Sequence, residues 1–326
     1  METKKYSAIL GNLGNTRDRF CNSYKDNPKS IEMLKKAASI EGITGIELVG
    51  TWDIHVKNVK EMKKALGDLG FVCVSIIPDL FSSSVWRFGS LSCRDGAVRK
   101  KAKEHVGDMC RIAQEMNCSI INLWPGQDGY DYLFQSNYYD ERKWLIENIS
   151  ELAAEFSTIK FALEYKVKEP RTHSYLARMA DTLLVCLQTG KENVGVTIDT
   201  GHAFMGGENV SESIVMAKQT GNRLFHMHFN DNYKSWDDDM IAGSIHSLEY
   251  LEMLYWLDEC GYDGWLSMDQ YPYREDAAGA ISESVNWLKF FNSLLEKNRG
   301  KIRDAVNTGN AVETSKMLRT VLMNEK

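Results

Sequence analysis

The sequence predicts an α/β fold, a (β/α)8 barrel with a short helical C-terminal extension, and three observations lead to it. The chain has 326 residues, a normal length for one barrel of this kind. Short apolar runs alternate eight times with longer segments in which apolar residues recur at helical spacing. The short runs are almost continuously apolar, as expected for parallel strands that are covered on both faces.

The expected strands, in chain order, cover residues 6–11, 44–50, 72–78, 119–124, 160–165, 194–199, 224–230 and 264–269. The expected helices between and after them cover residues 28–41, 57–70, 96–117, 139–158, 173–191, 209–221, 246–261 and 277–297. A doubly wound open sheet is the alternative. It usually carries a glycine-rich phosphate loop after its first strand, and residues 11–14 (GNLG) are too short a match to that motif.

The C-terminal residues fall outside the eight repeating units. We therefore expect a catalytic barrel over residues 1–297 and a polar, helical tail over residues 298–326. The sequence leaves two roles open for this tail, a cap on the barrel or an arm that packs on a neighbouring subunit. We expect a homo-oligomer, a dimer or a tetramer.

Composition excludes several classes of protein. The net charge is −6 and no cluster of lysine and arginine is interleaved with aromatic residues, so we expect no nucleic-acid partner. No apolar run approaches the roughly 18 residues of a membrane helix, so we expect no membrane partner. Seven cysteines without a C-x-x-C pair, and an N-terminus without a signal-peptide pattern, indicate a reduced cytoplasmic protein.

Residues that can bind a metal close four consecutive expected strands: Glu164, Asp199, His228 and Asp269. In a barrel the carboxyl ends of all strands form one rim, where active sites lie. Carboxylate and imidazole ligands suit a divalent ion, with Mn²⁺ our first choice and Mg²⁺, Co²⁺ or Zn²⁺ as alternatives. A single carboxylate after a strand often caps the next helix instead, but capping does not account for a histidine.

Two further features adjoin this rim. His226 and His228 are two residues apart, so both point to the same side of one strand; we expect His228, nearer the mouth, to be the ligand and His226 to lie deeper. In the next loop, Asp237 and Asp239 could hold a second cation together with Asp199 and His202, or could belong to a solvated loop. Lys234 is either a surface lysine or a contact to a substrate oxygen.

These residues lie in motifs that resemble those of xylose isomerases. Residues 164–171 (EYKVKEPR) resemble E-P-K-P-N-E-P-R, and residues 195–202 (GVTIDTGH) resemble G-(I/V)-N-P-E-x-G-H. Residues 224–230 (LFHMHFN) are similar to L-F-H-I-D-L-N, and residues 237–243 (DDDMIAG) to D-Q-D-L-x-F-G. Residues 79–81 and 124–129 resemble N-L-F and W-G-G-R-E-G, and residues 262–272 resemble Y-D-G-P-R-H-F-D-Y-K-P. The resemblance runs in order from about residue 70 to 290.

The resemblance implies a metal-dependent sugar enzyme of the xylose isomerase-like superfamily. It implies that Glu164, Asp199, His228 and Asp269 surround a structural metal, and that Asp199, His202, Asp237 and Asp239 surround a catalytic one. It implies that Lys166 binds a carbonyl or hydroxyl oxygen of the sugar. It also implies that Trp124 and Phe81 wall the apolar face of the sugar.

Two departures from the xylose isomerase pattern affect the substrate. The histidine that helps to open the sugar ring in that family has no counterpart in residues 48–53, and His55 lies further along the loop. His228 stands where xylose isomerases have aspartate, which is similar to the tagatose 3-epimerase and rhamnose isomerase branches. The epimerases have glutamate in place of Asp269, so aspartate there favours an isomerase.

We therefore expect an enzyme that interconverts an aldose and a ketose by moving hydrogen between C1 and C2. The transfer occurs as a hydride, or as a proton with Glu164 or Asp269 as the base; Lys166 and His202 complete the expected catalytic set. The alternative is a keto-sugar 3-epimerase, or a lyase-like deglycosidase that acts on 3-keto glycosides. An endonuclease IV-like repair enzyme and a non-enzymatic sugar-binding barrel are less favoured, the repair enzyme because histidines are few and the charge is acidic.

Overall fold

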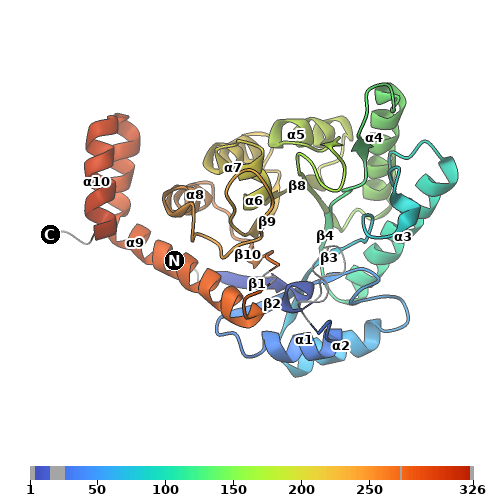
Figure 1. Ribbon diagram of the computed structural model, residues 1–326, viewed down its shortest axis with the longest axis horizontal. Helices are drawn as coiled ribbons and strands as arrows, with labels where there is room; N and C mark the ends of the chain where they lie inside the picture. The colour runs from blue at the N-terminus through green and yellow to red at the C-terminus, as the bar shows by residue number, and fades with distance from the viewer. Residues whose placement is uncertain (1–3, 15–25, 272–273, 324–326) are drawn as a thin grey trace.

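A closed barrel of parallel strands forms the centre of the computed structural model, which describes residues 4–14, 26–271 and 274–323 (Figure 1). The strands pair around the barrel in the order β1-β10-β9-β8-β6-β4-β3-β2. Their bounds are β1 Lys5–Ile9, β2 Ile43–Val49, β3 Val72–Ile77, β4 Ile120–Leu123, β6 Lys160–Glu164, β8 Val194–Asp199, β9 Leu224–Phe229 and β10 Trp265–Met268. The predicted (β/α)8 barrel is confirmed.

Helices surround the barrel (Figure 1). They are α1 Ser30–Ala37, α2 Val59–Asp68, α3 Gly96–Glu115, α4 Tyr138–Glu155, α5 Met179–Gln188, α6 Thr200–Met205, α7 Val210–Gln219, α8 Ser247–Glu259, α9 Ala277–Thr308 and α10 Ala311–Met323. Two short strands, β5 Gly129–Tyr130 and β7 His173–Ser174, pair outside the barrel. The expected helix over 173–191 therefore begins later, because its first residues belong to β7 and the segment after it.

The side chains that fill the interior of the barrel are polar, although the sequences of the strands are mostly apolar. In β2, Ile46 and Leu48 face the surrounding helices and belong to the main apolar core, whereas Glu47 between them reaches across the barrel to β9. This alternation is the ordinary geometry of a strand, in which successive side chains point to opposite faces. The same alternation points Asn122, Thr197 and other buried polar side chains inward, where they hydrogen-bond to one another.

Helix α6 was not expected, and it begins where β8 ends. The Asp199 side chain caps this helix, because its Oδ1 accepts a hydrogen bond from the His202 backbone N–H at 2.8 Å. The chain therefore passes from strand to helix without a loop. As a result His202, three residues after the strand, stays at the rim of the barrel.

Helix α9 continues well beyond the barrel, and α10 follows after Gly309, whose φ is 61°, at a steep angle to α9 (Figure 1). The expected boundary between residues 297 and 298 falls inside α9. Most of the buried side chains of α9 precede this point, and Ile302 follows it. Residue 272 of the motif match over residues 262–272 and residues 324–326 of the expected tail lie outside the described residues. No described helix is long and apolar enough to cross a membrane.

Candidate metal centre at the carboxyl end of the barrel

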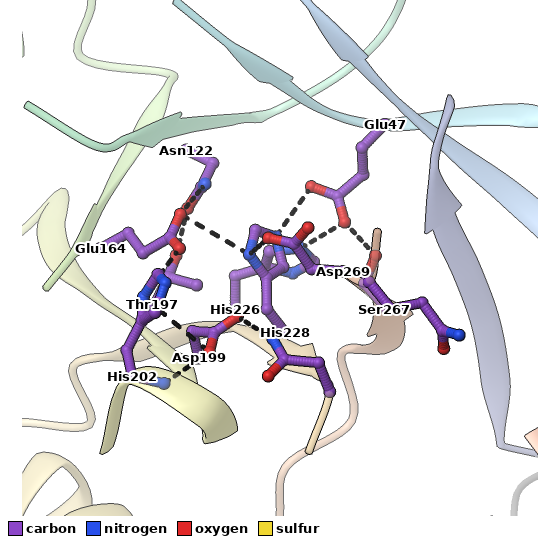
Figure 2. A network of polar contacts seen from close by, with 12 residues as sticks. Glu47, Asn122, Glu164, Thr197, Asp199, His202, His226, His228, Ser267 and Asp269 are labelled. Carbon is purple, nitrogen blue, oxygen red and sulfur yellow. Dashed lines mark hydrogen bonds and ion pairs between the residues drawn. The ribbon is translucent and has the colours of Figure 1, made fainter. Parts of the chain in front are cut away.

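The structure brings the first predicted ligand set together on four strands that are neighbours in the barrel, β6, β8, β9 and β10. One atom each of Glu164, Asp199, His228 and Asp269 lies within 4.8 Å of the others (Figure 2). His228 Nδ1 is 3.2 Å from Asp269 Oδ2 and 3.6 Å from Glu164 Oε2. Three of these residues are buried and Asp269 is partly exposed. The arrangement has the size and the ligand types of a site for one divalent cation.

A second group shares Asp199 with the first. It consists of Asp199, His202 and Asp237, whose ligand atoms also lie within 4.8 Å of one another. His202 Nε2 is 3.3 Å from Asp237 Oδ2, and its Nδ1 is 3.3 Å from Glu164 Oε1. Asp239 is buried and lines the same cavity, but it is not a member of this group among the described residues.

Two buried ring nitrogens in these groups indicate whether the residues fit a metal. His228 Nδ1 and His202 Nδ1 are buried and make no hydrogen bond within the part of the chain that the structure describes. Leaving a buried polar atom without a partner costs about 1–3 kcal/mol, so such atoms call for an explanation. A cation bound between these nitrogens and the facing carboxylates would satisfy them. The residues present therefore fit a divalent ion.

The carboxylates of the site differ in their tendency to ionise. Burial raises the pKa of Asp199 to about 7, and the nearby charges of Asp269, Asp237 and Glu164 add to the rise against the effect of His202. Burial also favours the neutral form of Glu164, but the His228 and His202 imidazoles and the Asn122 amide lower its pKa to about 2. Glu164 is thus a fixed negative charge, and Asp199 is a carboxyl group that a proton can occupy.

The imidazoles respond to this negative charge. Burial lowers the pKa of His202, but Asp199 and Asp237 outweigh it and raise the pKa to about 9. The pKa of His228 is raised well above its usual value by Glu47 and Glu164, again against burial. Without a cation, protons on the two rings therefore balance the carboxylates. A divalent ion would take over this role and displace protons.

Lys166 contributes a buried positive charge beside the second group. It follows β6, and its Nζ lies 2.6 Å from Glu169 Oε2 and 2.7 Å from Asp237 Oδ2. The same Nζ is 5.3 Å from the centre of the Trp124 ring. Lys166 therefore lies between the acidic groups and the aromatic side of the cavity, which it helps to line.

An apolar wall faces the acidic groups across the cavity. Phe81 and Trp124 pack with ring centres 4.6 Å apart, and Trp52 packs edge-on against Phe81 at 5.6 Å. The ends of β1, β2 and β3 complete this wall with Ile9, Val49 and Ile77. The cavity thus has an apolar half from the first strands and a charged half from the later ones.

Comparison with models of protein families shows which family has this fold. The model of the family described as xylose isomerase-like TIM barrel matches residues 34–291. The chain belongs to this family. The xylose isomerase of Thermus thermophilus is 26% identical over 304 residues, which are 88% of this chain and 77% of that protein.

Solved structures of other proteins share the fold of this chain. A D-tagatose 3-epimerase-like protein superposes with a TM-score of 0.69 at 21% identity and covers 89% of this chain and 99% of its own. The 3-keto-D-glucoside 4-epimerase of E. coli superposes with a TM-score of 0.67 at 15% identity and covers 88% of this chain and 100% of its own. These likenesses show the fold alone.

Two residues that the sequence analysis considered for the site, Lys234 and His55, lie away from the cavity. Lys234 is exposed, and its Nζ is 3.6 Å from Glu249 Oε1 on α8. His55 is exposed too, and its Nδ1 accepts a hydrogen bond from the Lys57 backbone N–H at 3.2 Å. Among the described residues, His202 is the one histidine that lines the cavity.

Several candidate ligands are held by buried side chains that the sequence patterns did not indicate. Asn122 in β4 donates to Glu164 Oε2 at 2.6 Å, and Thr197 in β8 donates to Asn122 Oδ1. Glu47 in β2 contacts both His226 and His228 (Figure 2). A signal for Glu47 was present, because a lone charged residue within an apolar strand run has to find a partner in the interior.

Proposed function

We propose that this chain is a divalent-metal-dependent sugar isomerase that interconverts an aldose and a ketose. The observation that supports this most is the placement of Glu164 and Asp269 beside His228 Nδ1, at the charged half of a cavity whose other half is aromatic. Sugars have the same two faces, with hydroxyl groups on one and C–H bonds on the other. Mn²⁺ is the first candidate for the ion, and one or two ions are consistent with the two groups.

The residues have distinct roles in this proposal. Glu164, Asp199, His228 and Asp269 hold the ion, which when bound supplies Lewis acidity toward a carbonyl and a neighbouring hydroxyl. Trp124 and Phe81 pack on the C–H face of the sugar. Lys166 places its ammonium where negative charge develops on the substrate oxygen and stabilises it.

Hydrogen transfer needs a group that accepts a proton and returns it. Glu164 and Asp269 approach the site from the ends of β6 and β10, and both face His228 Nδ1. One carboxylate can therefore remove the proton from the hydroxyl-bearing carbon next to the carbonyl and return it to the carbonyl carbon, while the hydroxyl proton passes to the carbonyl oxygen. A hydride shift between the two carbons is the other route, for which the carboxylates serve as ligands alone.

One observation favours a second function, a keto-sugar 3-epimerase or a deglycosidase acting on 3-keto glycosides. His202 is the one histidine among the described residues that line the cavity, and it belongs to the second ligand group. A separate imidazole for ring opening is thus not found in the described lining. A substrate that arrives with an open chain, or already oxidised, needs none.

A substrate panel tests these functions. The purified chain, supplied with Mn²⁺, is offered aldoses, ketoses and 3-keto glycosides, and products are followed by chromatography in D₂O. We expect aldose–ketose interconversion; deuterium incorporation during turnover would identify proton transfer, and its absence a hydride shift. If the enzyme only inverts ketoses at C3, or only converts 3-keto glycosides, the isomerase proposal is wrong and the second function is supported.

The ligand set is tested by Glu164→Gln, which removes a charged ligand without changing its size. We expect the bound metal to be lost and turnover to fall by at least the roughly 10²–10⁴-fold that a general base contributes. Glu147→Gln on the surface of α4 is the control. If metal content and turnover both survive the Glu164 change, this metal centre is wrong.

We also propose a cellular location, a partner and an oligomeric state for this enzyme. The described cysteines are free thiols, namely Cys73, Cys93, Cys110, Cys118, Cys186 and Cys260. This supports a reduced cytoplasmic location. We propose a small-molecule sugar as the partner of the site, and a homo-oligomer as the working assembly.

A further inference from the structure

Glu47 lies inside the barrel, on the side of His228 that faces away from Glu164 (Figure 2). It comes from the middle of β2 and reaches across the interior to β9. Its Oε1 is 2.9 Å from His226 Nε2, and its Oε2 is 3.3 Å from His228 Nε2. All three side chains are fully buried. The carboxylate therefore contacts Nε2 of the His228 ring, whose other nitrogen, Nδ1, faces the proposed metal.

Two hydroxyl groups complete the surroundings of this carboxylate. Ser75 in β3 donates to Glu47 Oε2, and Ser267 in β10 donates to Glu47 Oε1. Each carboxylate oxygen thus faces one imidazole and one hydroxyl. An ionised carboxylate has about four acceptor positions, and here all of them are used. The group Glu47, His226 and His228 has the composition of a metal site, but no lone pair of Glu47 remains for a cation.

This arrangement decides which nitrogen of His228 can bind a metal. An ionised carboxylate accepts hydrogen bonds and donates none, so His228 Nε2 keeps its proton and points it at Glu47. The lone pair that a metal needs is then on Nδ1. That atom lies 3.2 Å from Asp269 Oδ2 and 3.6 Å from Glu164 Oε2, and it makes no hydrogen bond in the described structure.

We propose that Glu47 is a positioning residue that fixes the tautomer and the ring orientation of His228, so that Nδ1 is presented to the metal. The inference rests on the metal centre of the proposed function. It adds to that function a residue that touches neither substrate nor metal. Partners of this kind orient a ligand histidine, and their loss lowers metal affinity by about 10–100-fold.

The first test is the affinity of the full chain for Mn²⁺ after Glu47→Gln. Glutamine keeps the shape but offers one carbonyl oxygen in place of two carboxylate oxygens, so it cannot accept from both rings and both serines. We expect Mn²⁺ affinity to fall about 10–100-fold, measured by calorimetry, with the circular dichroism spectrum unchanged. Glu141→Gln is the matched control, since Glu141 is also buried but lies on α4 and accepts a hydrogen bond from Tyr175.

The outcomes separate the inference from the proposed function. If Glu47→Gln binds Mn²⁺ as tightly as the wild type while Glu164→Gln does not, the positioning role is refuted and the metal centre stands. If Glu164→Gln retains the metal, the metal centre itself fails. An equal loss of affinity in Glu141→Gln would also overturn the positioning role, because the effect would then be a general one of altering a buried glutamate.

A second measurement uses the wild-type Glu47 and applies even where Glu47→Gln does not fold. The wild-type chain, with ¹⁵N-labelled histidine, is loaded with ¹¹³Cd²⁺ and examined by NMR. We expect cadmium to couple to Nδ1 of His228 and a proton to be observed on its Nε2. The resonances are assigned by their absence from His228→Gln. Coupling of cadmium to Nε2 instead would overturn the inference.

Discussion

Asp199 combines two roles that a sequence pattern presents as alternatives. Its Oδ1 caps α6 through the His202 backbone N–H, and its Oδ2 accepts a hydrogen bond from Asn230 at 2.8 Å. The same carboxylate belongs to both ligand groups. A carboxylate after a strand can therefore be a helix cap and a candidate ligand at once, since the cap fixes the orientation that the ligand needs.

The raised pKa of Asp199 predicts how metal affinity depends on pH. Because its pKa is raised to about 7 and that of His202 to about 9, protons occupy both groups at low pH and compete with the ion. We expect Mn²⁺ affinity to fall as the pH drops below about 7 and to rise from there toward pH 9. Calorimetry in buffers of different ionisation enthalpy would count the protons released. An affinity that does not change over this range would contradict the prediction.

The loop after β9 predicts the metal stoichiometry. Asp237 belongs to the second group alone, and Asp239 lines the cavity beside it. We expect Asp237→Asn combined with Asp239→Asn to remove one ion and to leave the other, measured by elemental analysis of protein dialysed against Mn²⁺. Asp238→Asn in the same loop is the control, because Asp238 belongs to neither group. An unchanged metal-to-protein ratio would show that the centre holds a single ion.

At the scale of elements, the strand period decides what enters the interior. In β9, alternation points His226 and His228 to one side and Met227 and Phe229 to the apolar core outside. Helix α6 then holds His202 at the rim, because it starts directly after Asp199, the last residue of β8. The site is thus built from the ends of strands whose outward faces are fixed by helix packing.

The C-terminal helices predict a separable segment. Helix α10 packs on α9 and lies apart from the barrel (Figure 1). An apolar cavity between α8, α9 and α10 is lined by residues such as Trp256, Val306 and Leu318. We expect a chain that ends at Thr308 to keep its metal content but to form a smaller oligomer, as determined by light scattering. The same oligomer after truncation would favour the cap over the arm.

At the scale of the whole molecule, the buried carboxylates predict a link between metal and stability. The chain carries a net charge of −6, and its rim concentrates acidic groups that a bound ion can neutralise in place of protons. An ion that binds only the folded state stabilises it by about 2.7 kcal/mol at a concentration 100 times its Kd. We expect the Tm to rise with Mn²⁺ and to fall with a chelator. Glu164→Gln is the control and is expected to show a much smaller rise; an equal rise would place the stabilising ion elsewhere.

The barrel, and the residues that meet at its rim as candidate ligands, could be predicted from the sequence. Eight repeats of apolar run and helical segment are local periodicities, and a parallel barrel is the fold that buries them all. Once the strands are parallel, their carboxyl ends meet at one rim, so Glu164, Asp199, His228 and Asp269 could be brought together without coordinates. For Asp237 the residues alone left two interpretations open, a second cation site with His202 or a solvated loop, and the resemblance to xylose isomerases favoured the first.

The tertiary structure alone decided the contacts that cross the barrel. Glu47 meets His226 at a separation of 179 residues, and Lys166 pairs with Asp237 at a separation of 71. It also turned Lys234 away from the cavity and carried α9 through the boundary expected at residue 297. Such contacts depend on the stagger of strands around the closed barrel, which is a property of the whole ring and leaves no periodic trace in any single strand.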